Sequence, residues 1–178
     1  ALKGDCHLHS TWSDGGAPIE AMAATAIAIG HEYMVQTDHS ARLTVAHGLD
    51  AERLREQLAE VAELNERLAP FRILTGIECD INEDGTLDQT DELLGRVDIV
   101  VASVHSKLRS DSGSMTRRML RAIENPHTDI LGHCTGRLVG QALSLPFDTA
   151  RALHAAAARS GLIKKSILEG RDFELTLA

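Results

Sequence analysis

Six side chains that can bind metal ions stand at or just after the ends of short apolar segments. They are His7, His9, His39, Glu78, His105 and His133. When parallel strands alternate with helices in a barrel, the C-terminal strand ends meet at one mouth, so residues far apart in sequence come together there. Imidazole nitrogens and carboxylate oxygens are ligands of Zn, Mn and Fe. The pattern therefore predicts a multinuclear metal hydrolase.

The two strongest of these segments contain His7-Leu8-His9 and Glu78. Residues two apart on a strand point to the same side, so His7 and His9 can serve one ion, although a polar strand end would look the same. Glu78 lies in an otherwise apolar segment, where an ionised carboxylate is costly to bury unless it is paired or binds a metal. A bridging role between two ions would suit Glu78, and a salt bridge with Arg72 or another cation is the alternative.

The remaining candidates are ambiguous when each is taken alone. His105 and His133 each end a hydrophobic segment and could instead be hydrogen-bonded core histidines. Asp38 stands beside His39 and could be the ligand itself or could orient a histidine. Asp14 lies in Ser-Asp-Gly-Gly, which also reads as an ordinary turn.

Strand-like and helix-like segments alternate along the whole chain. One helix should open at Pro18 and stop at Gly30, and a longer one should be capped by Asp50. This alternation predicts an α/β fold with a parallel sheet, closed or nearly closed, in a single domain over residues 1–178. The other expected elements are strands at 3–9, 33–39, 71–81, 99–105, 129–133 and 162–168 and helices near 91–94, 114–124 and 148–160.

Composition and charge narrow the class of protein. The net charge of −8 argues against a protein that coats duplex nucleic acid, so a nucleic-acid role would be local, as at a strand end. The three cysteines have no Cys-x-x-Cys spacing, which favours a reducing cytoplasm over a disulfide framework. No apolar run has the length of a membrane span, so we expect no membrane partner.

Five motifs carry a family resemblance. They are GDCHLHSTWSDG at 4–15, TDHS at 37–40, GIECDI at 76–81, ASVHS at 102–106 and NPHTDILGH at 125–133. In this order they resemble the PHP (polymerase and histidinol phosphatase) superfamily. The likeness is greatest to the PHP domain of bacterial family X DNA polymerases and to stand-alone PHP hydrolases.

The resemblance implies a distorted (β/α)7 TIM-like barrel that holds two to three divalent metal ions, Zn, Mn or Fe. His7 and His9 would hold one ion, and Glu78 would bridge it to a second ion held by His105 and His133. Asp14 and His39 would hold the third. The family's last motif, an Asp-x-His on the final strand, is not found after Gly161. We therefore expect a barrel that is incomplete at its C-terminal end.

The implied activity is that of a metal-dependent phosphoesterase. It would hydrolyse a phosphomonoester or a nucleic-acid 3′-end phosphodiester by metal-activated hydroxide, with Glu78 and His105 at the catalytic centre. The partner would be a phosphorylated small molecule or a nucleic-acid end. A metal hydrolase of C–N bonds and a degenerate, non-catalytic metal-binding or interaction domain are the alternatives.

Basic and aromatic residues near the motifs suggest further roles. Lys107, Arg109 and Arg137 could clamp a substrate phosphate, or they could be ordinary solvated loop charges. Trp12 could stack on a base or sugar, but we expect it to anchor its loop by packing. Three arginines at 117, 118 and 121 are expected to form a face of a helix.

Overall fold

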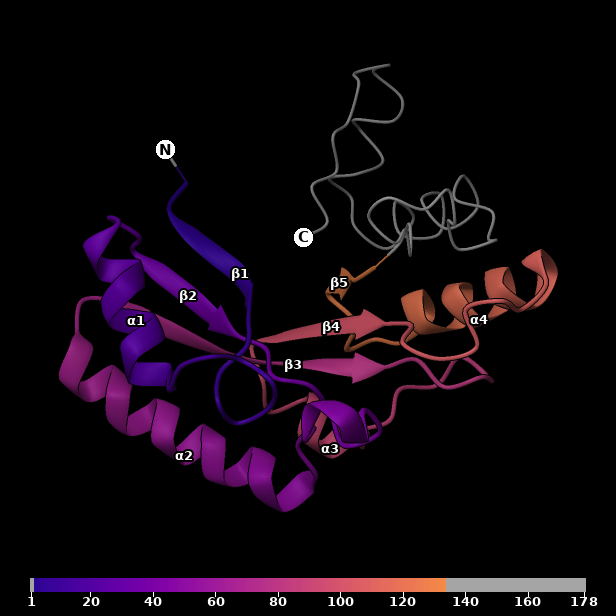
Figure 1. Ribbon diagram of the computed structural model, residues 1–178, viewed down its shortest axis with the longest axis horizontal. Coiled ribbons are helices and arrows are strands. Elements are labelled where there is room, and N and C mark those ends of the chain that lie inside the picture. Colours follow the sequence, from indigo (N-terminus) through magenta and orange to yellow (C-terminus); the bar gives the residue numbers. More distant parts are fainter. Residues whose placement is uncertain (1, 134–178) are drawn as a thin grey trace. The chain divides into compact units, whose positions relative to one another are not determined.

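The structure of the protein is a computed structural model that describes residues 2–133 (Figure 1). Strands and helices alternate along these residues, which confirms the predicted α/β class. The helix expected at 148–160 and the strand expected at 162–168 lie outside the described residues. The elements are β1 Gly4–Leu8, α1 Ile19–Ala28, β2 Tyr33–Gln36, a 3-10 helix Thr44–Ala46, α2 Ala51–Leu68, β3 Arg72–Asp80, α3 Asp91–Leu94, β4 Ile99–Ser103, α4 Ser112–Glu124 and β5 Ile130–Leu131.

The strands form one sheet whose hydrogen-bonding order is β1-β2-β3-β4-β5, the same as their order along the chain. β1 and β2 are parallel, with Gly4 opposite Tyr33, and β2 and β3 are parallel, with Tyr33 opposite Arg72. Parallel neighbours joined through helices are the building units of a βα barrel wall. The register also brings the C-terminal ends of β1, β2 and β3 to the same edge, where the candidate ligands stand.

The chain divides into two compact units. Unit 1 comprises residues 1–80 and 88–101, and unit 2 comprises residues 81–87 and 102–178. Unit 1 holds β1 to β3, most of β4 and helices α1 to α3, whereas unit 2 holds the end of β4, α4 and β5. Residues 2–133 contain no helix with the length and apolar character of a membrane span.

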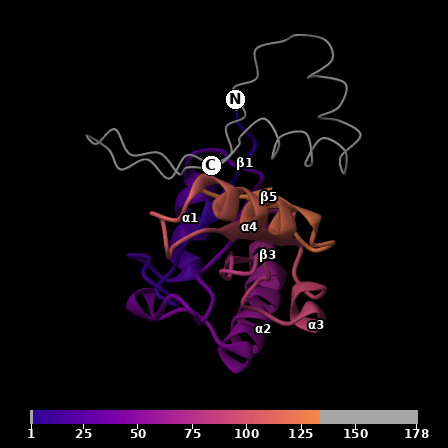
Figure 2. The ribbon, with the colours of Figure 1, turned by 90° about the vertical axis from the view of Figure 1, so that its right-hand side faces the viewer.

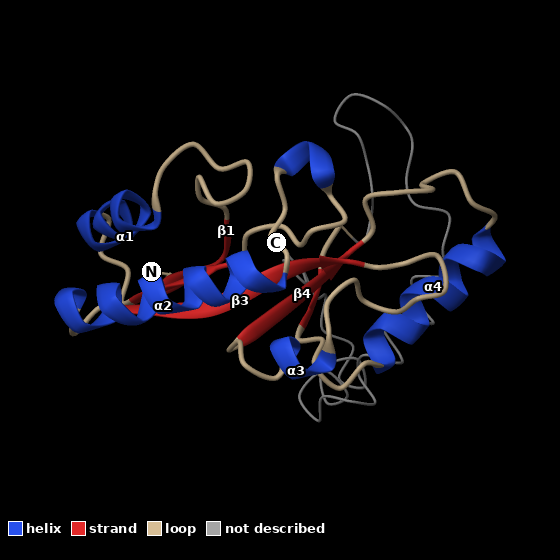
Figure 3. Ribbon diagram, turned by 90° about the horizontal axis from the view of Figure 1, so that it is seen from below, coloured by secondary structure: helices blue, strands red, loops and turns tan. Residues whose placement is uncertain are grey.

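In unit 1, helices α1 and α2 pack on strands β2 and β3 and form one core (Figures 1 and 3). Apolar residues at helical spacing make this possible, because they line one side of each helix. The burial of Trp12 against this core confirms that it anchors its loop. The fully or nearly fully buried core residues are Ile19, Ala23, Ala26, Met34, Val61, Leu64, Phe71 and Ile73.

The helix boundaries in unit 1 follow from the predicted caps. Asp50 accepts hydrogen bonds from the backbone N–H groups of Glu52 and Arg53, which α2 itself leaves without partners. Pro18 precedes the first residue of α1, and Gly30 adopts a left-handed conformation with φ of 87° just after that helix ends. The start of α2 and both ends of α1 therefore lie where local chemistry favours them.

In unit 2, the three arginines expected to form one face of α4 do not share the same surroundings. Arg118 is only 4% exposed, whereas Arg117 and Arg121 are exposed. The reason is helical spacing, because position 118 falls on the same side as the buried Met115 and Met119. Its guanidinium donates hydrogen bonds to the backbone carbonyls of residues 81, 82 and 106 and to the Ser106 hydroxyl. A buried charge is thus stabilised by carbonyl dipoles at two loops.

Helix α4 begins with a cap and leads into β5 through residues 125–129 (Figure 2). The Asp111 side chain accepts from the Ser114 N–H at 2.9 Å and caps the helix. At its end, the Thr128 hydroxyl donates to the Ala122 carbonyl at 2.8 Å. The next strand, β5, is tied to β4 by the hydrogen bond from Gly132 N–H to the Ala102 carbonyl at 2.9 Å.

Candidate metal centre

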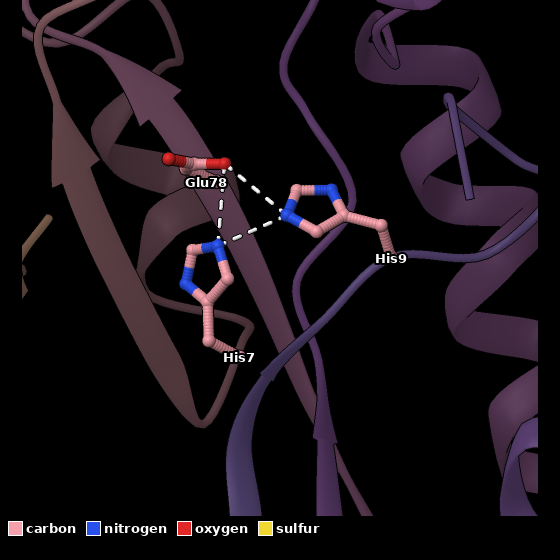
Figure 4. A group of neighbouring side chains, drawn as sticks. All are labelled: His7, His9 and Glu78. Atoms are coloured by element: carbon pink, nitrogen blue, oxygen red, sulfur yellow. Dashed lines mark hydrogen bonds and ion pairs between the residues drawn. The ribbon is translucent and has the colours of Figure 1, made fainter. Parts of the chain in front are cut away.

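Three candidate ligands of unit 1 point their side chains at one another (Figure 4). The Nε2 atoms of His7 and His9 are 2.9 Å apart, and each lies 3.4 Å from Oε2 of Glu78. His7 is in β1, His9 follows its last residue, and Glu78 is near the end of β3. The alternation of side chains along a strand brings both histidines to the same side, as the sequence predicted.

Because Glu78 is buried, its neighbours must stabilise the charge of its carboxylate. The Glu78 side chain has no exposed surface, and a carboxylate in that setting needs positive charge or hydrogen bonds nearby. Arg72, the partner considered from the sequence, is exposed at the opposite end of β3, about 20 Å away at the usual rise per residue. The groups around Glu78 Oε2 are instead imidazoles.

His39 is the third imidazole beside this oxygen. Its Nδ1 atom lies 3.0 Å from Glu78 Oε2. His39 lies beyond the end of β2, but an isolated parallel bridge pairs its backbone with that of Glu78. The hydrogen bonds from Ser40 N–H to the Glu78 carbonyl and from Glu78 N–H to the Asp38 carbonyl are each 3.0 Å long. The backbone of one strand thus fixes where the histidine of its neighbour stands.

Asp14 joins a second group of candidate ligands in unit 1, with His9 and His39. Its Oδ1 lies 3.6 Å from Nδ1 of His9, and its Oδ2 lies 3.7 Å from Nε2 of His39. The side chain of Asp14 is half exposed, so this side of the group is open to solvent. A Cβ at Gly15 would collide with the His9 carbonyl, which shows how tightly the chain turns back after the strand.

The protonation of His9 suits a metal ligand. Burial lowers the pKa of His9 and the neighbouring His7 lowers it further, while the charges of Glu78, Asp38 and Asp14 oppose these effects. A lowered pKa keeps the imidazole neutral at pH 7, and only the neutral ring binds a metal. Three nitrogens converging on one buried carboxylate oxygen fit a divalent ion of the Zn, Mn or Fe type.

Asp38, the alternative ligand, belongs to neither of these two groups. Its two oxygens accept hydrogen bonds from Ser10, Ser13, Gln36 and Gln57. The sequence did not single out Gln57, although one signal was present. It occupies a buried position in the apolar row of α2 formed by residues 54, 61 and 64. A polar residue in such a row needs a hydrogen-bonding partner.

The remaining candidates lie in unit 2 or outside the described residues. The rings of His105 and His133 have centroids 5.2 Å apart and meet nearly edge to face. Lys107 and Arg109 are exposed, and Lys107 Nζ lies 3.8 Å from a carboxylate oxygen of Glu83. Arg137 lies outside the described residues. Arg118 supports the loop that begins just after His105, through its hydrogen bonds to Ser106.

Comparisons with known proteins identify the family of this chain. The PHP domain family matches residues 5–167, and the chain belongs to this family. It is 42% identical to the DNA polymerase/3′-5′ exonuclease PolX of Bacillus subtilis (strain 168), over 99% of the chain and 33% of that protein. It is 33% identical to the probable phosphatase Teth514_1060 of Thermoanaerobacter sp. (strain X514), over 72% of the chain and 52% of that protein.

A third relative is the probable phosphatase TTE1963 of Caldanaerobacter subterraneus subsp. tengcongensis, 34% identical over 51% of the chain and 35% of that protein. The chain therefore spans a third of the polymerase relative and about a third to a half of these phosphatases. The family membership covers the segments that carry the histidines and Glu78.

Proposed function

We propose that this chain is a metal-dependent phosphoesterase with the distorted (β/α)7 barrel implied by its motifs. The observation that carries the proposal is the position of Glu78 Oε2. This buried oxygen lies 3.4 Å from His7, 3.4 Å from His9 and 3.0 Å from His39. We infer that this convergence of imidazole nitrogens on a buried carboxylate serves to hold divalent cations.

The proposed centre holds two to three Zn, Mn or Fe ions. His7, His9 and Glu78 would hold the first ion, Glu78 would bridge to a second held by His105 and His133, and Asp14 with His39 would hold a third. The geometry of unit 1 supports metal binding by His7, His9, His39 and Asp14. His9 lies between the two groups of ligands, because its Nε2 faces Glu78 and its Nδ1 faces Asp14.

When bound, such ions supply activation of water at neutral pH and stabilise the charge that develops on phosphoryl oxygens. The residues of the chain do the rest. Glu78 and His105 form the catalytic centre, and the neutral His9 keeps a nitrogen lone pair available. Lys107, Arg109 and Arg137 bind the substrate phosphate, Arg through its paired N–H groups. The half-exposed Asp14 marks an accessible side of the unit 1 ligands.

The 3′ end of a single-stranded nucleic acid is our first choice of substrate, and a small phosphomonoester is the second. The match to the protein named as a polymerase and 3′-5′ exonuclease covers nearly the whole chain, more than the matches to probable phosphatases. The net charge of −8 fits recognition of a chain end better than binding along a duplex.

A direct test compares metal-stripped protein with protein reloaded with Mn, Zn or Fe. The substrates are a 5′-labelled single-stranded oligonucleotide with a 3′-hydroxyl, the same oligonucleotide with a 3′-phosphate, and an aryl phosphate. We expect stepwise shortening from the 3′ end only after reloading, and its loss in Glu78→Gln. Hydrolysis that survives both chelation and Glu78→Gln would overturn the proposal. Metal binding without hydrolysis of any of the three would favour a non-catalytic role.

A further inference from the structure

We propose that Asp38 is a positioning residue that sets how tightly a divalent cation binds at His9, Asp14 and His39. The proposal rests on the metal-binding part of the proposed function and adds to it a residue that is not itself a ligand. We call Asp38 and its four partners, Ser10, Ser13, Gln36 and Gln57, the Asp38 network. Four of its members are at most 2% exposed and Ser13 is 7% exposed, so the network is closed to solvent.

The carboxylate of Asp38 accepts five hydrogen bonds. Oδ1 accepts from the N–H of Ser10 at 2.8 Å and from the hydroxyl of Ser13 at 2.5 Å. Oδ2 accepts from the Ser10 hydroxyl at 2.7 Å and from Nε2 of Gln36 and of Gln57 at 2.6 Å each. These donors are neutral. They orient the carboxylate, but none of them carries a positive charge that would neutralise it. The charge of the carboxylate lies beside the centre, because Asp38 directly precedes His39 and accepts a hydrogen bond from the residue that follows His9.

The two serines place this network at the edge of the centre. Ser10 follows His9 directly and Ser13 precedes Asp14 directly, so Asp38 holds the β1–α1 loop beside both ligands. The loop is also closed on itself, since Ser13 N–H and Gly15 N–H both donate to the Ser10 carbonyl. Moving the serines therefore moves Asp14 relative to His9.

Helix α2 supplies the other support. Gln57 reaches Asp38, and Arg53 and Glu60 on the same side of the helix both hold Trp12. Arg53 donates to the Trp12 carbonyl, and the Trp12 indole N–H donates to Glu60 Oε2 at 2.7 Å. Residues 53, 57 and 60 are spaced so that they share one side of a helix. The β1–α1 loop is thus fixed from the core side at both Trp12 and Asp38.

The test uses Mn2+ alone as the probe, with the free ion measured by paramagnetic resonance. Asp38→Asn replaces one accepting oxygen by an amide NH2 group. That group would then face the N–H and O–H donors of the network and could not accept their hydrogen bonds. We expect a 10- to 100-fold loss of Mn2+ affinity, the range typical for groups that support metal ligands. Asp38→Asn should weaken only the Mn2+ site that Asp14→Asn also removes. The double variant Asp38→Asn/Asp14→Asn should therefore bind Mn2+ no more weakly than Asp14→Asn alone.

Asp98→Asn is the matched control. Asp98 Oδ2 accepts from both the N–H and the hydroxyl of Thr75, as Asp38 accepts from both groups of Ser10, but three residues before Glu78 in β3, about 10 Å away at the usual rise per residue. We expect its Mn2+ affinity to equal that of the wild type. If Asp38→Asn does not fold, Ser13→Ala removes a single hydroxyl of the network and should still weaken Mn2+ binding.

A second readout does not depend on metal. Trp12 is the only tryptophan and lies within the loop, so its fluorescence reports on that loop. Asp38→Asn and Ser13→Ala should make Trp12 more accessible to acrylamide, whereas Asp98→Asn should not. The proposal would be overturned if Asp38→Asn and Ser13→Ala both kept the wild-type Mn2+ affinity. It would also be overturned if Asp38→Asn reduced Mn2+ affinity as much in the Asp14→Asn variant as in the wild type. A wild type that binds Mn2+ as expected but hydrolyses no phosphoester would refute the proposed activity and leave this inference standing.

Discussion

His39 and Glu78 are joined twice, once through their backbones and once through their side chains. A parallel bridge pairs the two residues, and His39 Nδ1 lies 3.0 Å from Glu78 Oε2. The bridge means that the imidazole is positioned by main-chain hydrogen bonds rather than by its own flexible side chain alone. Metal ligands that are held before the metal arrives lose little conformational entropy on binding it.

Glu78→Gln should weaken metal binding more than Asp14→Asn does. Glu78 Oε2 lies beside three imidazoles and is fully buried, whereas Asp14 is half exposed at one side of the group. We expect a loss of roughly 100-fold or more for Glu78→Gln and roughly tenfold for Asp14→Asn, by comparison with the effects of supporting residues. Titration with Zn2+ or Mn2+ measures both, with the exposed Glu56→Gln as control. Equal losses would mean that Glu78 does not bridge.

The stability of the metal-free protein should fall as the pH is lowered below 6.5, in part because of His9. Burial lowers the pKa of His9 in the folded state below its usual 6.5, so the unfolded chain takes up a proton first. The contribution is complete above pH 6.5 and is lost as the pH falls toward the folded-state pKa. Urea unfolding at pH 7.5, 6.5 and 5.5 should show a smaller pH dependence in His9→Gln. The exposed His47→Asn should keep the wild-type slope.

Arg118→Met should destabilise unit 2 by about 3 kcal/mol, because the buried Ile81 carbonyl and the part-buried carbonyls of Asn82 and Ser106 lose a charged donor. Urea unfolding provides the measurement. Arg117→Met on the exposed side of the same helix should change the free energy of unfolding by less than about 0.5 kcal/mol. Similar effects of the two substitutions would show that the hydrogen bonds of Arg118 contribute little.

Cys79 should resist alkylation in the native protein. It is fully buried, and burial together with the charges of Asp88, Asp80 and Glu78 raises the pKa of its thiol well above the usual value. The reactive thiolate is therefore scarce as well as inaccessible. After treatment with iodoacetamide at pH 8, peptide mass spectrometry should find Cys79 modified only when urea is present. The half-buried Cys6 is the internal comparison, and equal native rates would contradict this prediction.

Local chemistry made much of the fold predictable. The cap at Asp50 and the apolar spacing that follows it predicted the start of α2, and α3 spans Asp91–Leu94 as expected. The convergence of His7, His9 and Glu78 was also predictable, because strand alternation and parallel register require only short-range rules.

Contacts between distant segments were not predictable in the same way. The sequence expected a strand to His39, but β2 ends at Gln36 and His39 is attached by a single bridge. The role of Asp38 depends on donors from a loop, a strand and a helix, and Arg118 depends on carbonyls that only the folded chain brings to α4. Such interactions are set by tertiary structure, which periodicity does not report.

The parallel order of the strands has a consequence for biosynthesis. His7, His9, Asp14, His39 and Glu78 all come from the first three strands and the loops that follow them. Because a chain emerges from the ribosome N-terminal end first, these ligands are synthesised before any of unit 2. A nascent chain that has just completed β3 therefore already contains every candidate ligand of unit 1, and the metal supply during translation becomes relevant to how the protein folds.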